Sequence, residues 1–314
     1  MKIRTGYIAL ISTLFIGCNT TPTVSYDWGQ YPIPVDAPEG FAWELQPHSD
    51  DFNYDFQGAD ELTEFGGKWT NYYHGRWSGP APTIWRHDHV KVEGGNLQIR
   101  ASRPEDVEMK NVKSGDGSVT LPGTYSGCIT STQRIVYPAY IEARAKLSNS
   151  VMASDVWMLS PDDTQEIDII EAYGSDRDGG GYGADRLHLS HHVFIRSPFQ
   201  DYQPHDPGTW YRDPEGIIWR NDFHRVGVYW RDPTYLEYFV DGKSVRVVEG
   251  MDIIDPKGFT DGTGLTKEMD IIINMEDQSW RAIKGLTPTD EELQNEEDCT
   301  FNVDWIRVYK LVKE

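Results

Sequence analysis

The segment Glu166–Gly174 constrains this chain most, because it reads as a β-strand yet carries three carboxylates within six positions. Side chains alternate between the two faces of a regular strand, so Glu166 and Asp168 share one face and Glu171 falls on the other. One extra residue at Ile169–Ile170, a β-bulge, would return Glu171 to the face of its partners. Three acids on one face repel each other, and a hydrophobic core gains nothing from that arrangement.

Paired carboxylates are what glycoside hydrolysis requires, one ionised as nucleophile and one protonated as acid. On this interpretation Glu166, Asp168 and Glu171 project together into an open cleft. The alternative is a solvated strand edge that carries acidic side chains without any chemistry. The segment alone does not separate these two interpretations.

The composition limits the class of protein and its partners. The chain has 314 residues, 12% of them aromatic, and a formal net charge of −21. The aromatic content argues against disorder over most of the length. The charge argues against nucleic acid and against an anionic membrane surface as partner, and it disfavours a densely sulfated substrate. We expect a folded protein that acts as a monomer.

Residues 1–17 have the features of an export signal. Lys2 and Arg4 precede an apolar run, Tyr7–Ile16, that is too short to span a bilayer. The run ends before Cys18 and resembles a bacterial lipobox, in which this cysteine becomes the lipidated N-terminus. The alternative is an ordinary secretory signal with a chance cysteine.

Residues 18–40, rich in Thr, Pro, Ser and Tyr, are predicted to be a flexible tether behind the lipid anchor. We therefore expect an extracytoplasmic protein that contacts a bilayer only through its lipidated N-terminus. The expected location is the bacterial outer membrane, with exposure at the cell surface or release left open.

No linker, repeat or low-complexity block interrupts residues 41–314, which predicts a single catalytic domain. Val240–Lys243 has the composition of a tight hairpin turn, and Thr289 is a candidate cap for one short helix. Short apolar runs between Gly, Pro, Asp and Asn predict an all-β sandwich of two sheets, of the jelly-roll type. The clearest strand candidates are 96–102, 126–135, 140–147, 156–159, 187–195, 223–230, 235–240, 245–248, 269–275 and 303–311.

Several blocks together resemble a known family. Glu166–Glu171 matches the Glu-x-Asp-x-x-Glu signature of glycoside hydrolase family 16. The stretch Val303–Tyr309 is similar to the closing strand of that family, and the likeness extends from about Phe41 to the C-terminus. Three longer stretches resemble its β-agarases, namely Asp162–Gly174, Leu189–Pro204 and Gly264–Arg281.

The resemblance implies a concanavalin A-like jelly roll with a concave cleft. It also implies a retaining endo-hydrolase that cleaves β-1,4 galactosidic bonds in agarose to neoagaro-oligosaccharides, with no cofactor for catalysis. Carried over by position, Glu166 is the nucleophile, Glu171 the general acid and base, and Asp168 the supporting carboxylate between them.

Further residues are candidates for substrate contact. Trp157 would offer an apolar face to a sugar ring, with a core tryptophan as the alternative. His192 and Arg196 are four residues apart and share a strand face, with a surface pair as the alternative. Glu276 and Gln278 alternate so that both face one cleft, and the resemblance makes Glu276 a substrate contact. Additional stacking candidates, some of which must be core residues, are Trp69, Trp77, Trp85 and Trp280.

The resemblance also implies a structural calcium ion away from the cleft, with Asp304, Gly95 and Asp51 as candidate ligands. Sodium, or no ion, is the alternative. The run His188–His192 contains three histidines but has no matching acid or cysteine elsewhere, so a metal cluster there is disfavoured.

Cys128 lies in a strand-like run and is expected to be a buried free thiol. Outside the cytoplasm a bond to Cys299 is the alternative, because the sequence does not show how close the two lie.

Three other functions remain open at this point. A porphyranase or carrageenase of the same family would need a cationic pocket for sulfate, and Arg196 is the only strong candidate. A non-catalytic galactan-binding module or lectin could use the same sandwich, but it has no use for three carboxylates on a bulge. A structural surface protein would show neither binding nor turnover.

Overall fold

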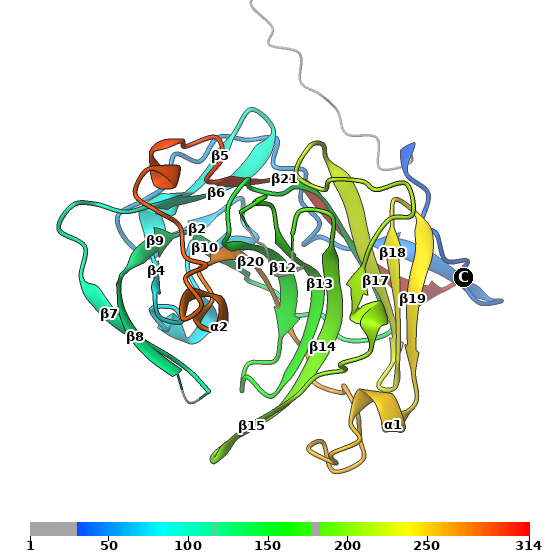
Figure 1. Cartoon of the computed structure of the whole chain (residues 1–314). Helices are drawn as coiled ribbons and strands as arrows, with labels where there is room; N and C mark the ends of the chain where they lie inside the picture. The colour runs from blue at the N-terminus through cyan, green and yellow to red at the C-terminus, as the bar shows by residue number, and fades with distance from the viewer. Residues whose placement is uncertain (1–29, 116, 178–182) are drawn as a thin grey trace, which may run out of the picture.

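The computed structural model describes residues 30–115, 117–177 and 183–314. Two large β-sheets pack face to face in this part of the chain, which confirms the predicted jelly-roll sandwich (Figure 1). The predicted signal segment, Cys18 and the tether up to Gly29 lie outside the described residues. Among the helices of the described ranges, none is both long and apolar enough to cross a bilayer.

The inner sheet has nine strands in the described part of the chain and carries the acidic strand near its middle. In spatial order it contains β15 (Phe199–Tyr202), β14 (Leu187–Arg196), β13 (Gln165–Tyr173), β12 (Ala153–Leu159), β20 (Asp270–Glu276), β10 (Cys128–Ser131), β3 (Trp69–Thr70) and β2 (Glu64–Phe65), with β16 (Trp210–Tyr211) paired to β14.

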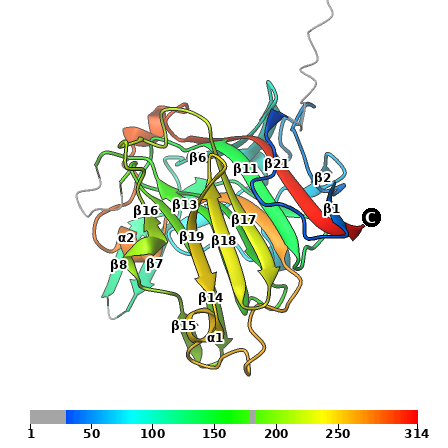
Figure 2. The same cartoon turned by 90° about the vertical axis from the view of Figure 1, so that its right-hand side faces the viewer.

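The outer sheet has ten strands within the described residues, and Figure 2 shows its strands β17, β18 and β19 side by side. In spatial order it contains β19 (Lys243–Glu249), β18 (Tyr235–Val240), β17 (His224–Asp232), β11 (Ala139–Lys146), β21 (Thr300–Lys313), β6 (Asn96–Ser102), β9 (Thr124–Ser126) and β4 (Thr83–Trp85), with β1 (Phe41–Leu45) on β21 and β5 (Val90–Glu93) on β6.

Smaller elements flank the sandwich. A separate hairpin of β7 and β8 stands across from β14 in Figure 1 and contacts the short helix α2, which follows β20. These elements are β7 (Met109–Ser114), β8 (Gly117–Pro122), α1 (Met251–Ile254), α2 (Ser279–Ala282) and the 3-10 turns His74–Arg76, His87–His89, Pro207–Thr209 and Glu292–Gln294.

The core lies between the two sheets and is built from the inward half of each alternating strand. On β13, Ile167 and Ile169 are fully buried, whereas Glu166 and Asp168, which alternate with them, line the cleft on the other face. Val228 and Ile306 are equally buried on the outer sheet. Because the isoleucine face of β13 is buried in this core, the acids occupy the other face of the strand.

Local sequence signals set several boundaries. Asp241 and Gly242 both have positive φ in the turn between β18 and β19, as a two-residue hairpin requires. At the predicted short helix, the Glu292 amide donates to the Thr289 hydroxyl, and the Thr289 amide donates to the Glu292 carboxylate. This reciprocal cap precedes a 3-10 turn and no α-helix follows, so the predicted helix is only one turn long.

The predicted tether is shorter than residues 18–40 at its domain end. The Trp43 indole donates to the Val35 carbonyl at 2.8 Å, and Arg307 donates to the Tyr31 carbonyl. The Tyr31 ring also lies 5.9 Å from that of Trp305. Aromatic and apolar side chains therefore hold residues 31–35 against the outer sheet, although their Pro-rich composition resembles a linker.

Cys128 and Cys299 are both buried free thiols, which confirms the expectation for Cys128. Cys128 faces the cleft side of β10, where it pairs with Asn274 of β20. The alternative of a disulfide between the two cysteines is wrong for this structure.

Candidate active site

The acidic strand β13 carries a bulge where the sequence predicted one. Glu166 is paired with His192 of β14 and Glu171 with His188, so five steps along β13 span only four along β14. The same irregularity appears in the pairing of β13 with β12. The extra residue turns Glu171 to the face of Glu166 and Asp168, and all three line one cleft of about 460 Å³.

Three donors surround the carboxylate of Glu171. His188 Nδ1 lies 2.5 Å from Oε2, the Tyr173 hydroxyl 2.7 Å from Oε1, and Gln278 Nε2 3.0 Å from Oε1. The His188 ring stacks on Trp210, with 4.2 Å between centroids. Burial raises the pKa of Glu171, but the contacts with its donors outweigh burial and lower that pKa to about 2.

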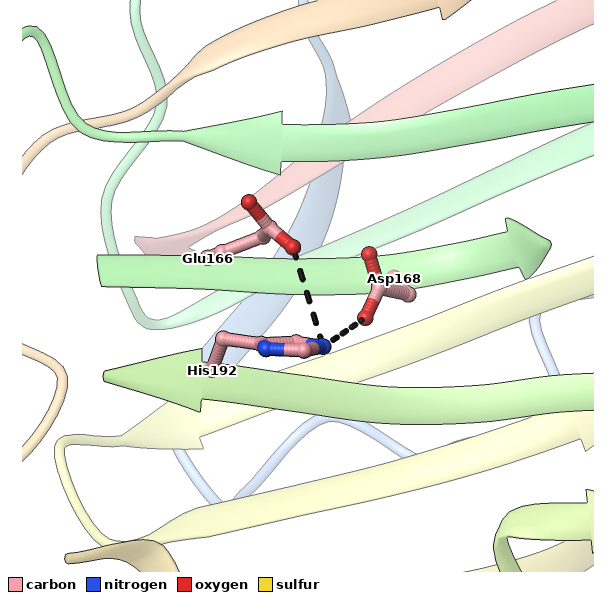
Figure 3. A group of neighbouring side chains, drawn as sticks. All are labelled: Glu166, Asp168 and His192. Atoms are coloured by element: carbon pink, nitrogen blue, oxygen red, sulfur yellow. Dashed lines mark ion pairs between the residues drawn. The ribbon is translucent and has the colours of Figure 1, made fainter. Parts of the chain in front are cut away.

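Glu166 and Asp168 share the imidazole of His192 (Figure 3). His192 Nε2 lies 3.9 Å from Glu166 Oε1 and 3.7 Å from Asp168 Oδ2, and its Nδ1 lies 2.9 Å from Asp201 Oδ1. Burial lowers the pKa of His192, but the surrounding carboxylates raise it to about 10. Its positive charge therefore sits between the two acids.

The proton affinities of the three signature acids differ because their surroundings differ. Burial raises the pKa of Glu166 well above its usual value, and the charge of Asp168 adds to that rise. Burial also raises the pKa of Asp168, to about 6, although His192 opposes the shift. Glu171 therefore loses its proton at a lower pH than Glu166 or Asp168, and the raised proton affinity of the latter two belongs to the pair.

Two further carboxyl groups lie on the floor beyond Glu171. Asp155 of β12 is paired with Glu171 of β13. Glu276 of β20 is paired with Ala153, two residues before Asp155 on β12. Burial, together with the charges of Glu171 and Asp277, raises the pKa of Glu276 to about 8. Burial and the charge of Glu276 likewise raise the pKa of Asp155.

Most of the predicted substrate contacts line this cleft. All five residues from the family-like blocks are in its lining, namely Trp157, His192, Arg196, Glu276 and Gln278. Trp77 and Trp280, predicted as stacking candidates, line it as well.

Two predicted stacking residues are structural, so those predictions are wrong. Trp69 is completely buried in the core between the sheets, and its indole donates to Asp50 Oδ2 at 2.8 Å. Trp85 is only 3% exposed and packs in a small cluster beneath the cleft with Tyr73 and Leu159. Both lie on short strands whose facing could not be read from alternation over two or three residues.

Sequence reasoning missed several lining residues. The cleft also contains Tyr73, Trp210, Phe199 and Asp155, and His188 was considered only as part of a metal cluster. His188 had a usable signal, because its four-residue spacing from His192 places both on one face of β14. Asp155 had one as well, because its two-residue spacing from Trp157 places both on one face of β12. The others come from loops and edge strands without periodicity.

The three histidines of β14 do not converge. His191 is fully buried on the opposite face and its Nε2 donates to the Ile254 carbonyl at 3.0 Å, whereas His188 and His192 line the cleft. A metal cluster of these three is therefore wrong.

Among the described residues, two other sets of side chains could reach a single cation, and both lie in the cleft. They are Glu166, Asp168 and His192, and Asp168, Glu171 and His188, each with ligand atoms within 4.8 Å of one another. Both sets consist of the signature acids and their imidazole partners. A cation there would compete with the protons that these acids need.

The residues predicted as calcium ligands lie on neighbouring backbone segments. The pairing of β21 with β6 on one side and an isolated bridge on the other places Asp304 near both Gly95 and Asp51. One carboxylate and backbone carbonyl oxygens suit calcium. Asp304 also forms an ion pair with Arg144, which neutralises part of the charge that would hold the ion.

Comparisons with known proteins agree with this geometry. A family model described as "Beta-porphyranase A-D, GH16 domain" matches residues 43–311. A β-agarase of Phocaeicola plebeius is 69% identical over 315 residues, which cover all of both chains. β-Porphyranase E of Zobellia galactanivorans is 27% identical over 289 residues, covering 88% of this chain and 90% of the relative.

Among solved structures, that of an inactivated mutant of β-agarase B in complex with agaro-octaose superposes with a TM-score of 0.83. It is 48% identical and covers 92% of this chain and 100% of the other. The sandwich, the bulged strand of three acids and the match over residues 43–311 lead to one conclusion: the chain belongs to glycoside hydrolase family 16.

Proposed function

We propose that the protein is a retaining endo-β-agarase that cleaves β-1,4 bonds of agarose and releases neoagaro-oligosaccharides. The observation that carries this proposal is the cleft face of β13, where the bulge brings Glu166, Asp168 and Glu171 together. Identity to a β-agarase is 69%, against 27% to a porphyranase. The neutral galactan is therefore favoured over its sulfated relatives.

The charge of the cleft favours the same choice. Its lining contains six carboxyl groups and a single arginine, Arg196, among the described residues. The Arg196 guanidinium lies over the Phe194 ring and its Nε donates to the Asp163 carbonyl. A sulfate ester would therefore enter a cleft with little positive charge to balance it, which is costly.

In the first step, Glu166 attacks the anomeric carbon and forms the glycosyl-enzyme bond. The oxygen of the departing sugar takes a proton from Glu171 at the same time. In the second step, Glu171 takes a proton from water, whose oxygen attacks the anomeric carbon and frees Glu166. The configuration at that carbon is retained because it is inverted twice.

For the first step Glu171 must gain a proton, because donation to the leaving sugar requires its neutral form. Glu171 is ionised in the free cleft, and His188 Nδ1 lies 2.5 Å from its carboxylate. The positive charge of His192 lowers the pKa of both Glu166 and Asp168, which favours the ionised Glu166 that the attack requires.

The decisive experiment measures new reducing ends from agarose and from porphyran under the same conditions, with the anomeric configuration followed by NMR. We expect rapid cleavage of agarose and β-configured products at early times. Binding of agaro-oligosaccharides without new chain ends would instead indicate a carbohydrate-binding module. Faster release from porphyran would indicate the sulfated substrate.

We also propose that Cys18 is lipidated and that this lipid anchors the domain to the outer membrane, as the segment before Cys18 indicates. Labelling with a radioactive fatty acid and membrane fractionation test this. The Cys18→Ala variant should lose both the label and the membrane fraction.

A structural calcium ion at Asp304, Gly95 and Asp51 is a separate proposal, supported by their register. A lower melting temperature after chelation, restored by calcium but not by sodium, would support it. Asp304→Asn should abolish that difference.

A further inference from the structure

Arg281 is a buried arginine behind the catalytic cleft. It lies on the short helix α2, shortly after the end of β20, and is only 1% exposed. Among the described residues that line the cleft Arg281 is absent, so it can influence the substrate only through its neighbours. Its guanidinium lies 3.7 Å from the centroid of the Tyr173 ring, a distance at which the positive charge is attracted to the face of the ring.

The Tyr173 hydroxyl connects this charge to the proposed acid and base. It donates to Glu171 Oε1 at 2.7 Å and also contacts the side-chain oxygen of Gln278. Burial raises the pKa of Tyr173 well above its usual range, and the charge of Arg281 opposes that rise. A more acidic hydroxyl is a stronger donor, so Arg281 strengthens the hydrogen bond from Tyr173 to Glu171.

The helix α2 sets both donors to Glu171 Oε1. Gln278 is its N-cap residue and donates to this oxygen at 3.0 Å. Arg281 covers the Tyr173 ring, and the Trp280 ring meets the same ring edge-on at 6.2 Å between centroids. Because all three side chains come from one short segment, the orientation of Tyr173 and that of Gln278 are fixed together.

Asp277, which precedes α2, compensates part of the buried charge of Arg281. Burial raises the pKa of Asp277 to about 6, whereas the hydroxyls of Thr287 and Thr124 and the charge of Arg281 oppose the rise. Both hydroxyls donate to its Oδ2, at 2.6 and 2.9 Å. Asp277 is also absent from the described lining of the cleft. A substitution there changes the surroundings of Arg281 without removing a contact to the substrate.

The hydrogen bonds to Oε1 matter when Glu171 gives up its proton. In the first step of the proposed reaction the proton moves to the oxygen of the departing sugar, and negative charge develops on the carboxylate. Donors that are already oriented stabilise this charge without reorganisation. A leaving group that departs as a stable anion needs no proton, so it does not depend on this stabilisation.

We propose that Arg281 is a positioning residue of the reaction, which acts through the Tyr173 hydroxyl to stabilise the carboxylate that forms on Glu171. This inference rests on the proposed agarase function and adds a residue that touches neither the substrate nor the reacting atoms. Loss of Arg281 should therefore slow the departure of a sugar more than the departure of a nitrophenolate.

The test compares kcat/KM on neoagaro-octaose with kcat/KM on 4-nitrophenyl β-neoagarotetraoside. The two substrates share a glycone when the octaose is cut at its central bond, but nitrophenolate leaves without a proton. Arg281→Met should lower the value on the octaose about tenfold and that on the nitrophenyl glycoside less than about twofold. Arg281→Lys keeps the charge and should regain part of the loss. Equal losses on both substrates would overturn the inference.

A double-mutant cycle locates the effect at the hydroxyl. Tyr173→Phe keeps the ring, and in this variant the further change Arg281→Met should alter the ratio of the two kcat/KM values less than about twofold. Independent, additive losses would also overturn the inference. Melting curves check that each variant is folded, and Arg281→Lys in the same cycle decides the outcome if Arg281→Met does not fold.

Two matched controls should leave the ratio of the two kcat/KM values unchanged. Asp277→Asn alters the same buried segment, and Arg231→Met removes a guanidinium that lies 3.5 Å from the centroid of Tyr235 on the outer sheet. A change of the ratio in Arg231→Met would show that the ratio does not report on Glu171, and this would overturn the inference. Failure of the wild-type chain to cut agarose would instead refute the proposed function.

Discussion

His188 lies directly opposite Glu171 on the neighbouring strand, with its Nδ1 2.5 Å from the carboxylate. His192 lies opposite Glu166 in the same way. Acids five residues apart meet histidines four residues apart only because the bulge adds one residue to β13. Each glutamate of the proposed reaction therefore has its own imidazole.

Replacement of either glutamate by glutamine should lower turnover of agarose by about 10³-fold or more, because covalent and acid–base catalysis each need a carboxyl group. Glutamine keeps the shape of the side chain, so the melting temperature should change little. Azide added to the Glu166→Gly and Glu171→Gly variants separates the roles by NMR. Glycosyl azide of inverted configuration is expected from the first variant and of retained configuration from the second, and the reverse pattern would exchange the two roles.

Loss of the His188 side chain should change how stability depends on pH. The pKa of Glu171 is depressed from 4.5 to about 2, so its stabilising contribution is present above about pH 4.5 and is lost as the pH falls through 2. In His188→Asn that pKa moves back up, and much of the contribution is missing. The difference in melting temperature between wild type and variant should be largest near neutral pH and should shrink towards pH 2. A difference that is constant over this range would contradict the role of the contact.

Tyr173→Phe is a graded control for this experiment. It removes one donor from Glu171 Oε1 and leaves His188 in place. It should therefore shift the same pH profile in the same direction by a smaller amount.

Glu276 should have the opposite pH effect. Its pKa is raised in the folded protein to about 8, so the folded state binds more protons than the unfolded state between about pH 4.5 and 8. Its effect is to make stability fall as the pH rises through that window. Glu276→Gln cannot ionise and should raise the melting temperature at pH 8 relative to pH 5. Glu268→Gln removes a carboxyl group at an exposed position and should not reproduce this relative gain.

Trp69 and Trp157 should respond differently to substitution, because one is in the core and the other in the cleft. Trp69→Phe removes a buried donor to Asp50 and should lower the free energy of unfolding by about 1–3 kcal/mol while leaving KM unchanged. Trp157→Ala should raise KM at least about tenfold. Chemical denaturation measures the change in stability and initial-rate kinetics the change in KM. A raised KM for Trp69→Phe would indicate that Trp69 contacts the substrate.

Much of the fold was predictable because its signals are local. The strand 96–102 and the hairpin around Asp241 and Gly242 have the predicted bounds and turn, since alternation and positive φ act over a few residues. The run 126–135 was predicted as one strand, but β10 covers only Cys128–Ser131. Pairing of β10 with β20 and β3, which the run itself does not specify, sets its length.

The sequence by itself determined that three carboxylates share one strand and that a bulge is needed to gather them, because strand alternation has a period of two. The tertiary structure decided which aromatic rings line the cleft. Trp69 and Trp85 are buried while Trp77 and Phe199 are exposed, and this depends on what covers each sheet face. It also decided that His188 is the partner of Glu171, because that contact forms between strands whose register is set by burial of the core.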